Sequence, residues 1–559
     1  HHSSVLFQGT PTPLFICTMI EIKDLTYRYN RKKTLFEGLD LQLMPGKVYG
    51  LLGKNGAGKS SLIKNIAGLL LPSQGACLVD GRETSERETG FLEQLFFLPE
   101  ESELPRLLIP KFLAIYAPFY PGFDKKQFYD NLATFNVDPG SHLQQLSFGQ
   151  RKKAYIAFAL AANTRVLIMD EPTNGLDIPS KIQFRKLVAA SKRQNKINII
   201  STHQVRDLDD LITTVLVMDD SKILLHADKE DISAQLFFST GEQEDPVYEE
   251  ETTTGLVSMS VNTKNLPSYL DLEVLFNATL KRGPWLDRIK KIGAANKIQP
   301  AKETDLPHLA KLPLLFKRQY LENNKLYRIA GLGLAAILLF LFFITWHFRN
   351  SFSGGTNQGI FLIGLFLSGS LFTSLLLKDL GQPSSGIWLM ALPASISQKL
   401  FVCIIFSIVF YVLSFVSIFF MVELLFNKIV GENSVRMEIK DLWKNGFYNF
   451  FFIYMNIQLL VLLGSISFKK AAFIKTIIIL LVFFLSVNSL NNALLGMITS
   501  ETAINGGEVF DYFQFVHGDE NVYVYLPENW QLILGIIFHY LVPCCIFYIT
   551  YLKFRETEI

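Results

Sequence analysis

The run Gly53–Ser61 constrains this chain more than any other feature, because its letters GKNGAGKSS fit the pattern G-x-x-x-x-G-K-[ST]. An apolar run, Val48–Leu52, comes before it and is typical of a buried strand, while Ser61–Ala67 after it are typical of a helix. Glycines allow the backbone to turn its N–H groups toward phosphate oxygens, and the start of the helix adds a favourable dipole. The sequence therefore predicts a strand–loop–helix unit that binds a nucleoside triphosphate, rather than a glycine-rich turn that binds nothing.

The residue types in this loop suit the chemistry of a triphosphate. Lys59 is placed to reach the β- and γ-phosphates, and the hydroxyl of Ser60 is placed to hold Mg²⁺. The loop residues that we expect to contact the nucleotide are Gly53, Asn55, Gly56, Ala57, Gly58, Lys59, Ser60 and Ser61.

Length and composition divide the chain into two parts. At 559 residues it exceeds what one hydrophobic core usually supports. Only 19% of the residues are charged, and the first half is charged and mixed while the second half carries long uncharged runs. We therefore expect an α/β P-loop NTPase domain followed by an all-α polytopic membrane domain. The formal net charge of +2 gives no reason to expect nucleic acid as a partner.

Two further strands are expected to deliver polar side chains to the edge where ligands bind in parallel α/β sheets. Val166–Met169 lead into Asp170 and Glu171, and Ile197–Thr202 lead into His203. Asp170 is placed to hold Mg²⁺, directly or through water, and Glu171 to polarise the attacking water. On its own His203 would be read as a structural histidine, but its place after these strands favours a contact with the γ-phosphate.

Two other stretches suit the same ligand. Leu146–Gln150 form a polar turn in which Ser147 is placed like a helix N-cap, and such a helix start is a second phosphate-binding end. Tyr27 and Tyr29 lie on the strand-forming stretch before the loop. Either could stack on an adenine ring or pack within a strand, and their spacing alone does not decide between these interpretations.

In this order, the motifs resemble the nucleotide-binding domain of ATP-binding cassette (ABC) transporters, over roughly Met19–Arg282. Gly53–Ser60 resemble the Walker A motif, and Val166–Glu171 resemble Walker B. Leu146–Gln150 resemble the LSGGQ signature, with Phe148 in the variable place. The resemblance implies an ATP-hydrolysing domain with ATP and Mg²⁺ as cofactors.

The resemblance also implies a role for individual residues. Glu171 and His203 are expected to be catalytic, and Ser60 and Asp170 to contact the magnesium ion. The further ATP contacts that it implies are Tyr29 as the adenine-stacking aromatic, Ser147, Gly149 and Gln150 of the signature, Asp177 of the D-loop, and Glu100, which stands where the family has the Q-loop glutamine.

In this family, ATP is sandwiched between the Walker A motif of one nucleotide domain and the signature of another. The sequence contains one of each. The resemblance therefore implies that two copies of the same chain meet head to tail as a homodimer. A heterodimer with a separate homologue is the alternative.

The chain is expected to divide further at both ends of this domain. Residues 1–18 resemble a purification tag with a protease site, and Met19 is the expected start of the protein. The expected domains are 19–282 for nucleotide binding, 283–328 for a connector, and 329–559 for the membrane domain. The connector's stretch Leu314–Arg328 is expected to be an amphipathic helix at the cytoplasmic interface. Within the first domain, the acidic run 242–251 is expected to be a solvated loop.

Six nearly uncharged runs have about the 20 residues that a bilayer-spanning helix needs. They are Ile329–Trp346, Ile360–Leu377, Leu400–Val422, Phe447–Phe468, Thr476–Met497 and Trp530–Leu552. Lys and Arg number 12 on the flanks expected inside and five on the opposite side, which predicts both termini inside. We therefore expect a multi-pass protein of the lipid bilayer, in a bacterial inner (plasma) membrane, with its nucleotide domain in the cytoplasm.

Polar residues inside these runs have two interpretations, either bonds between helices or a lining of a transport route. They are Asn449 and Asn456 in the fourth run, Asn488, Asn491 and Asn492 in the fifth, and His539 in the sixth. The segment Ile498–Asn529 is acidic and aromatic and has no Lys or Arg, so we expect a small ordered lid outside the membrane. Anchoring of its aromatic residues at the membrane surface is the alternative.

A nucleotide domain ahead of six spans resembles the layout of the type V exporters, which include the white and multidrug-resistance half-transporters. This resemblance implies ATP-driven export of a hydrophobic or amphipathic substrate, such as a small hydrophobic compound, a lipid or a peptide. The alternative is a non-transporting ABC mechanotransducer that acts on an extracytoplasmic partner. The six apolar runs argue against a soluble ABC ATPase that works on nucleic acid.

Overall fold

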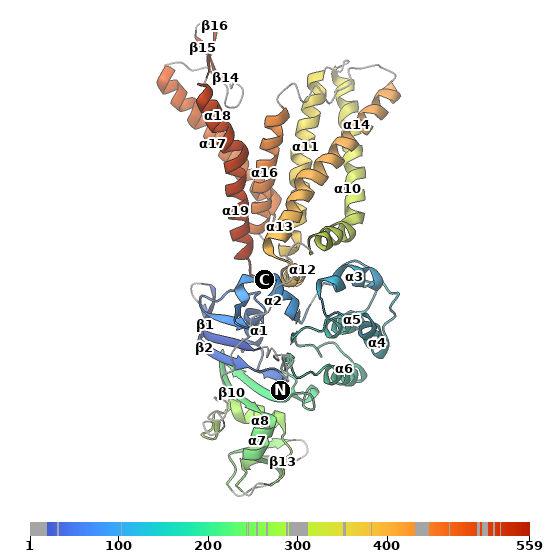
Figure 1. The fold of residues 1–559 in the computed structure, drawn as a ribbon, viewed down its shortest axis with the longest axis vertical. Coiled ribbons are helices and arrows are strands. Elements are labelled where there is room, and N and C mark those ends of the chain that lie inside the picture. Colours follow the sequence, from blue (N-terminus) through green and yellow to red (C-terminus); the bar gives the residue numbers. More distant parts are fainter. Residues whose placement is uncertain are drawn as a thin grey trace, which may run out of the picture. The chain divides into compact units, whose positions relative to one another are not determined.

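The computed structural model describes residues 19–558, except for 31–32, 102, 242, 244, 253–254, 264–265, 287–288, 290–310, 350–353, 382, 431–446, 469, 500–503, 506–511, 518–519 and 526. The chain divides into two compact units (Figure 1). The first runs to Leu314 and includes Met390–Ser395 and Glu558, and the second holds Leu315–Leu389 and Ile396–Thr557.

A six-stranded sheet with the order β10-β9-β3-β8-β7-β6 forms the centre of the first unit. Its strands are β3 (Val48–Leu52), β6 (Leu95–Leu98), β7 (Val166–Asp170), β8 (Ile197–Thr202), β9 (Thr214–Asp219) and β10 (Lys222–Asp228). All neighbours are parallel except β9 and β10. The runs Val48–Leu52 and Val166–Met169 are apolar throughout because parallel strands are covered on both faces. Since parallel strands end at the same edge, the segments that follow β3, β7 and β8 come together there.

A second sheet and a group of helices complete this central part. The sheet has the order β2-β1-β4-β5, formed by β1 (Ile20–Asn30), β2 (Lys33–Leu43), β4 (Gln74–Val79) and β5 (Arg82–Glu83). The helices are α1 (Lys59–Ile66), α2 (Thr89–Gln94), α3 (Ile109–Tyr116), α4 (Lys125–Thr134), α5 (Phe148–Ala161) and α6 (Ile178–Ala190). The Phe158 ring of α5 lies 5.0 Å from that of Phe112 in α3 and 4.8 Å from that of Phe123, so aromatic packing holds this helical layer together.

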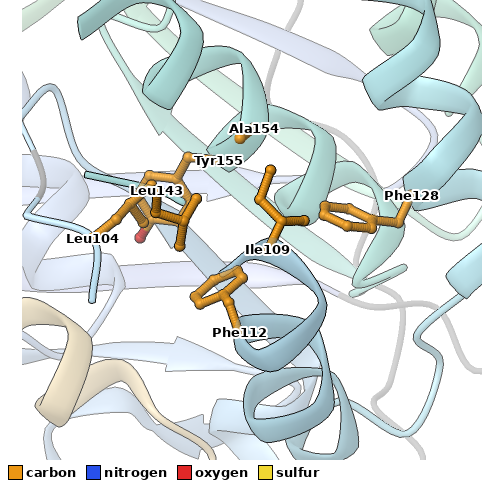
Figure 2. Close-up of a pocket in the computed structure, with 7 residues that line it drawn as sticks. All are labelled: Leu104, Ile109, Phe112, Phe128, Leu143, Ala154 and Tyr155. Atoms are coloured by element: carbon orange, nitrogen blue, oxygen red, sulfur yellow. The ribbon is translucent and has the colours of Figure 1, made fainter. Parts of the chain in front are cut away.

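A small apolar hollow lies within this helical layer (Figure 2). It is lined by Leu104, Ile109, Phe112, Phe128, Leu143, Ala154 and Tyr155. Ligand sites combine apolar walls with a few polar groups that orient the ligand, and these walls expose none. The hollow therefore belongs to the packing of the layer.

The first unit ends in a three-stranded antiparallel sheet that corrects one expectation. Its order is β11-β13-β12, with β11 (Leu236–Thr240), β12 (Tyr248–Thr252) and β13 (Gly255–Val261), and α7 (Lys229–Gln235) and α8 (Leu272–Leu280) flank it in sequence. The acidic run 242–251 is thus not all loop, because its end is β12. Tyr248 is buried while Glu249 and Glu251 are exposed, so the charges lie on the solvated face of the strand.

The second unit is helical. Its described α-helices are α10 (Leu312–Arg349), α11 (Gly354–Leu376), α12 (Pro383–Ala391), α13 (Ile396–Ile404), α14 (Tyr411–Val430), α16 (Phe447–Ser467), α17 (Ala472–Thr499), α18 (Glu528–Ile536) and α19 (Val542–Arg555). Two π-helical turns, Ile405–Phe410 and Ile537–Leu541, join α13 to α14 and α18 to α19. Among the described residues, five helices are long and apolar enough to cross a membrane, and Ala472–Val487 of α17 form a shorter apolar helix. The count of six spans therefore stays a prediction.

The connector helix and the first span were expected as separate elements, but α10 joins them without a break. Its only proline, Pro313, lies in the first turn, where proline is tolerated. Nothing between Leu314 and Trp346 therefore ends the helix, and the amphipathic stretch Leu314–Arg328 continues into the apolar one.

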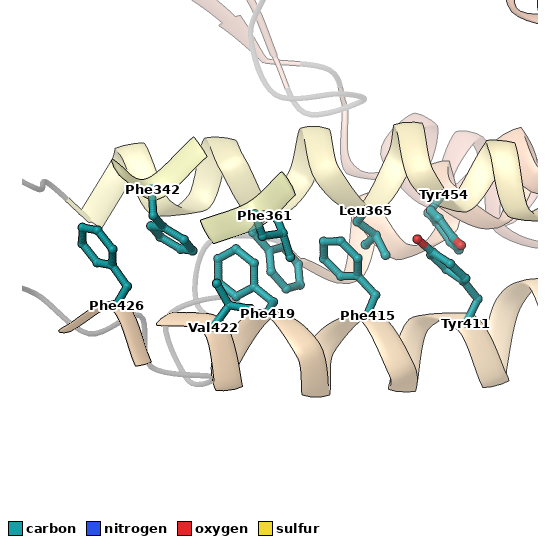
Figure 3. Close-up of a cluster of buried hydrophobic side chains, with 10 residues drawn as sticks. Phe342, Phe361, Leu365, Tyr411, Phe415, Phe419, Val422, Phe426 and Tyr454 are labelled. Carbon is teal, nitrogen blue, oxygen red and sulfur yellow. The ribbon is translucent and has the colours of Figure 1, made fainter. Parts of the chain in front are cut away.

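Aromatic side chains form the core of the second unit (Figure 3). Tyr411, Phe415, Phe419, Val422 and Phe426 recur every three or four residues, so they share one face of α14. They pack against Leu338 and Phe342 of α10, Phe361 and Leu365 of α11, and Tyr454 of α16. In lipid such close packing, rather than hydrophobic burial, holds helices together.

Polar residues of this unit bond between helices. Asn456 of α16 donates to the carbonyl of Phe538, in the turn before α19, at 3.3 Å. Thr373 of α11 donates to Oε1 of Gln458 of α16 at 2.7 Å. These contacts favour the first of the two interpretations for Asn456. The side chains of Asn449, Asn488, Asn491 and Asn492 lie outside the described residues.

The segment Ile498–Asn529 contains a three-stranded antiparallel sheet, β14 (Ile504–Asn505), β15 (Tyr512–His517) and β16 (Glu520–Tyr525). In its register Tyr512 pairs with Tyr525 and His517 with Glu520. The described part of this segment is therefore folded, and its role as a lid stays a prediction.

Candidate nucleotide-binding site

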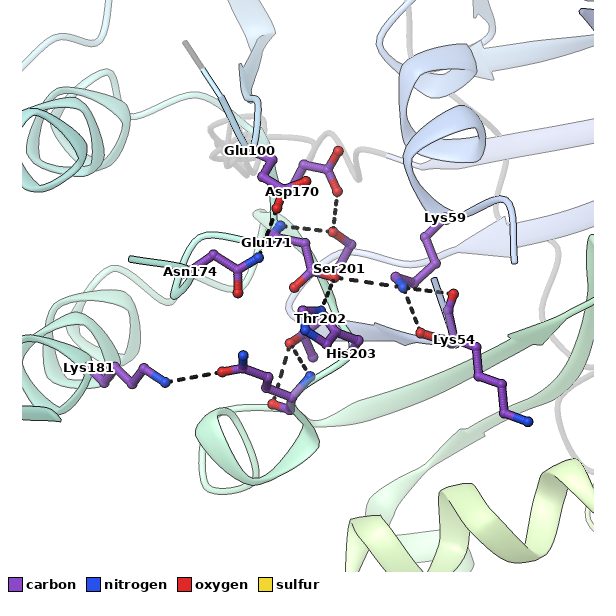
Figure 4. Close-up of polar contacts among 12 residues, drawn as sticks. Lys54, Lys59, Glu100, Asp170, Glu171, Asn174, Lys181, Ser201, Thr202 and His203 are labelled. Atoms are coloured by element: carbon purple, nitrogen blue, oxygen red, sulfur yellow. Dashed lines mark hydrogen bonds and ion pairs between the residues drawn. The ribbon is translucent and has the colours of Figure 1, made fainter. Parts of the chain in front are cut away.

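The loop after β3 is shaped for close approach to an anion. Gly56 and Gly58 have φ angles of 83° and 103°, a left-handed conformation that other residues adopt only at a cost. α1 begins at Lys59 directly afterwards. The Lys59 side chain is only 6% exposed, and its Nζ donates to the carbonyls of Gly53 at 2.6 Å and Lys54 at 3.2 Å (Figure 4). Burial lowers the pKa of Lys59, and the carboxylates of Glu171 and Asp170 act in the opposite direction.

The end of β7 places two carboxylates beside this loop. Asp170 accepts a hydrogen bond from the Ser201 hydroxyl of β8. Burial raises the pKa of Asp170, while hydrogen bonds from Ser201 and Ser60 oppose that shift. Glu171 Oε1 lies 3.7 Å from Lys59 Nζ and 2.9 Å from His203 Nδ1 (Figure 4). The three strand ends thus bring their polar residues together as the sequence predicts.

The backbone of Glu171 is strained and held in place. Its φ angle is 44°, in the left-handed region, which is uncommon for a residue with a side chain. Its N–H donates to the hydroxyl of Ser201 at 3.0 Å and to the carbonyl of Ser201 at 3.2 Å. Strain of this kind persists only where the surroundings fix the conformation.

One oxygen of Glu171 is buried and unused. Oε2 has no hydrogen-bond partner in the part of the chain that the structure describes. Leaving a buried carboxylate oxygen without a donor is costly, so such an atom calls for an explanation. Beside Lys59 and His203 it is suited to accept a hydrogen bond from a water molecule and to take its proton.

Glu100 lies in the same group of contacts. Its Oε1 accepts a hydrogen bond from Asn174 Nδ2 at 2.9 Å (Figure 4). Asn174 belongs to the turn that follows Glu171, so the segment after β6 is tied to the segment after β7. The carboxylate at the position expected for the Q-loop residue is therefore held within this group.

The signature turn has the predicted N-cap. Ser147 Oγ accepts from the Gln150 N–H at 3.3 Å, and Gln150 Oε1 accepts from the Ser147 N–H at 3.1 Å. Both side chains are exposed, and Phe148 is 51% exposed. A Cβ on Gly175 would lie 2.6 Å from the Phe148 ring, so the ring packs directly on that backbone.

Asp177, the predicted D-loop residue, caps the next helix. Its Oδ1 accepts from the Ser180 N–H at 3.2 Å, and the same oxygen lies 3.7 Å from Lys153 Nζ of α5.

In the described part of the chain, the side-chain hydrogen bonds of Ser147 and Gln150 remain within the signature turn itself. One chain therefore does not bring these signature side chains into hydrogen bonds with Lys59.

The structure distinguishes between the two tyrosines of β1. Tyr27 is buried at 1% exposure, so it packs within the strand, whereas Tyr29 is 54% exposed. The hydroxyls of Tyr29 and Ser61 are hydrogen-bonded, which places this ring next to the first turn of α1. Tyr29 is thus the one available for an adenine ring, and stacking there stays a prediction.

The sequence does not single out three residues of this network: Ser201, Asn174 and Lys152, whose Nζ donates to the backbone carbonyls of Glu171 at 2.8 Å and Glu100 at 3.2 Å. The helical spacing could have indicated that Lys152 is buried, because it shares a helix face with Tyr155, Ile156 and Ala159, which are buried apolar residues. No sequence pattern marks Ser201 or Asn174, since polar residues at strand ends and in turns are common.

The loop before α1 and the carboxylates after β7 define the class of a P-loop NTPase. The family model described as "ABC transporter" matches residues 36–174. The cytochrome c biogenesis ATP-binding export protein CcmA of Bradyrhizobium diazoefficiens is 32% identical, over 32% of this chain and 88% of that protein. The ABC transporter ATP-binding protein NatA of Bacillus subtilis is 29% identical, over 37% of this chain and 88% of that protein.

Among solved structures, an ATP-binding subunit of an ABC transporter is 24% identical with a TM-score of 0.36, covering 38% of this chain and 91% of that one. The match to CcmA, 32% identical over 88% of that protein, shows that the chain belongs to the ABC transporter family. It combines an ABC-type ATPase unit with a helical unit of about five to six apolar helices, which makes it a multi-pass membrane protein.

Members of this family bind ATP, normally with Mg²⁺, and the site fits both. The left-handed glycines and Lys59 Nζ suit phosphate oxygens, and the unused Glu171 Oε2 suits a water molecule. Among the described residues no group of three or more His, Cys, Asp or Glu could hold a metal ion. Mg²⁺ takes one or two protein oxygens and completes its shell with waters and phosphates, and the hydrogen-bonded pair of Ser60 and Asp170 offers such oxygens.

Proposed function

We propose that this chain is an ABC half-transporter that works as a homodimer and uses ATP to export a hydrophobic or amphipathic substrate across a bacterial plasma membrane. The substrate is a small hydrophobic compound, a lipid or a peptide. The observation that carries the proposal is that one chain joins a buried catalytic group, an exposed signature turn and five or more apolar helices. CcmA is itself named an ATP-binding export protein, which agrees with the proposed direction of transport.

The homodimer rests on the contrast between buried and exposed residues. Lys59 and Glu171 are almost completely buried, with Nζ and Oε1 3.7 Å apart, while Ser147 and Gln150 face solvent. A helix start is suited to bind phosphate, and the Ser147 hydroxyl, which accepts from the Gln150 N–H, still has a proton to donate. Two copies arranged head to tail give each nucleotide a Walker A loop from one chain and a signature turn from the other.

Each residue of the site then has a physical task. Lys59 and the loop N–H groups would bind the phosphates, and Ser60 and Asp170 would hold Mg²⁺. ATP supplies the free energy when it is bound and hydrolysed. A carboxylate has no proton to donate, so His203 Nδ1–H donates to Glu171 Oε1 and fixes the orientation of the side chain. Oε2 remains free to orient the attacking water and accept its proton.

The test uses the full chain in two preparations. ATP hydrolysis is measured in lipid nanodiscs with candidate lipids, peptides and drugs, and ATP-dependent uptake is measured in inside-out vesicles. We expect at least one class to stimulate hydrolysis and to accumulate in the vesicles, with no uptake by the Glu171→Gln variant. Hydrolysis without transport of any class would favour the mechanotransducer.

A further inference from the structure

Lys152 is a buried lysine that lies in the first turns of α5, beyond the signature turn. Its side chain is 7% exposed, and lysine is almost never buried unless it is paired. Its Nζ donates to the backbone carbonyl of Glu171 at 2.8 Å and to the backbone carbonyl of Glu100 at 3.2 Å. One ammonium therefore connects the signature helix to the segments that follow β7 and β6.

Both acceptors belong to the catalytic surroundings. The Glu171 carbonyl is part of the strained, left-handed residue whose carboxylate faces Lys59 and His203. The Glu100 segment is tied to the same loop a second time, through the bond from Asn174 to the Glu100 carboxylate. Because Ser201 holds the N–H of Glu171 and Lys152 holds its carbonyl, the two sides of this residue are fixed by different elements, β8 and α5.

We propose that Lys152 is a positioning residue for ATP hydrolysis. It fixes the main chain of Glu171, and with it the carboxylate, relative to the signature helix and to the Glu100 segment. Both of these hydrogen bonds go to backbone oxygens, so Lys152 acts through Glu171 and not on the nucleotide. A displacement of α5 or of the Glu100 segment is thereby transmitted to the group that orients the attacking water. Misplacing such a group by about 1 Å can reduce the rate about 100-fold.

The first experiment compares Lys152→Met with Lys152→Arg and with Lys196→Met, in full-length protein in nanodiscs. Lys196 is the matched control, because it is another buried lysine of the same unit and lies directly before β8, outside the hydrogen bonds of the site. We expect Lys152→Met to lower kcat by roughly 10- to 100-fold while the Kd for ATP changes less than about threefold. Lys152→Arg should recover part of the rate, and Lys196→Met should lose thermal stability with kcat nearly unchanged.

A double-mutant cycle separates positioning from a general structural role. If Lys152 acts through Glu171, adding Lys152→Met to Glu171→Gln should leave the residual rate within about twofold of Glu171→Gln alone, because the positioned carboxylate is already gone. Losses that multiply in the double variant would overturn the proposal. So would a wild-type kcat in Lys152→Met, or a loss of rate that only follows a loss of ATP binding. Should Lys152→Met fail to fold, the same cycle with Lys152→Arg decides.

Discussion

The two faces of the ATPase unit hold their polar groups in opposite ways. On the face of the P-loop, Lys59 and Glu171 are 6% and 7% exposed and are connected to His203, Ser201 and the loop carbonyls. On the face of the signature turn, Ser147 and Gln150 are exposed and bond to each other. The buried groups are already held in place within one chain, whereas the exposed turn has polar atoms that a second surface can cover. In the homodimer that we propose, each chain contributes its buried face to one site and its exposed turn to the other.

The largest effect is expected on the buried face. Glu171→Gln replaces the carboxylate with an amide of the same shape, so nucleotide binding should survive while kcat falls by about 10²- to 10⁴-fold, the usual effect of losing a general base. ATP affinity is measured by equilibrium binding and turnover by phosphate release. Hydrolysis at the wild-type rate would show that the unused Oε2 has no catalytic role.

A change on the exposed face should act differently. Ser147→Ala removes the N-cap of α5 and costs about 1 kcal/mol of stability, and it should also lower kcat/KM by about tenfold through the lost contact with the other chain's nucleotide. Asp124→Ala is the matched control, since Asp124 caps α4 by accepting from the Gln127 N–H at 3.0 Å. We expect the control to lose similar stability with no change in hydrolysis. If both variants hydrolyse ATP equally well, Ser147 acts only as the N-cap of α5.

Tyr29 should affect binding more than turnover. Stacking of a base on an aromatic ring contributes about 1–3 kcal/mol, so Tyr29→Ala should raise the Kd for ATP about tenfold while kcat at saturating ATP stays close to that of the wild type. Tyr129, which is 40% exposed on α4, offers a control in Tyr129→Ala. If the Kd is unchanged in Tyr29→Ala, Tyr29 does not bind the adenine ring, and its hydrogen bond to Ser61 has a structural role only.

The smallest effect is expected at Glu100. In Glu100→Gln the amide oxygen can still accept from Asn174, and the backbone carbonyl that Lys152 holds is unchanged. Hydrolysis should therefore stay within about threefold of the wild type, since only a hydrogen bond to a charged group is weakened. Complete loss of hydrolysis would mean that the negative charge of Glu100 has a task of its own.

Sequence could predict the placement of most residues on the buried face because that placement follows from topology. Asp170, Glu171 and His203 come directly after apolar strands, and parallel strands end at one edge of the sheet. The supporting contacts could not be predicted in the same way, since Ser201 and Asn174 bond to residues that only the fold brings near. Likewise, the acidic composition of 242–251 concealed β12, whose charges lie on one face, and the change from amphipathic to apolar sequence concealed the continuity of α10.

The complementary halves can be tested directly by pairing two inactive chains. Lys59→Ala ruins the P-loop face and Ser147→Arg ruins the signature face, so each homodimer has two defective sites. Co-expressed with different affinity tags and purified in sequence, the mixed dimer has one complete site and should hydrolyse ATP at up to about half the wild-type rate. A mixed dimer of Lys59→Ala with a chain that carries both changes has no complete site and should stay inactive. Hydrolysis by the first mixed dimer above both parents is the expected result, and no recovery in it would contradict a site shared head to tail between two copies of this chain.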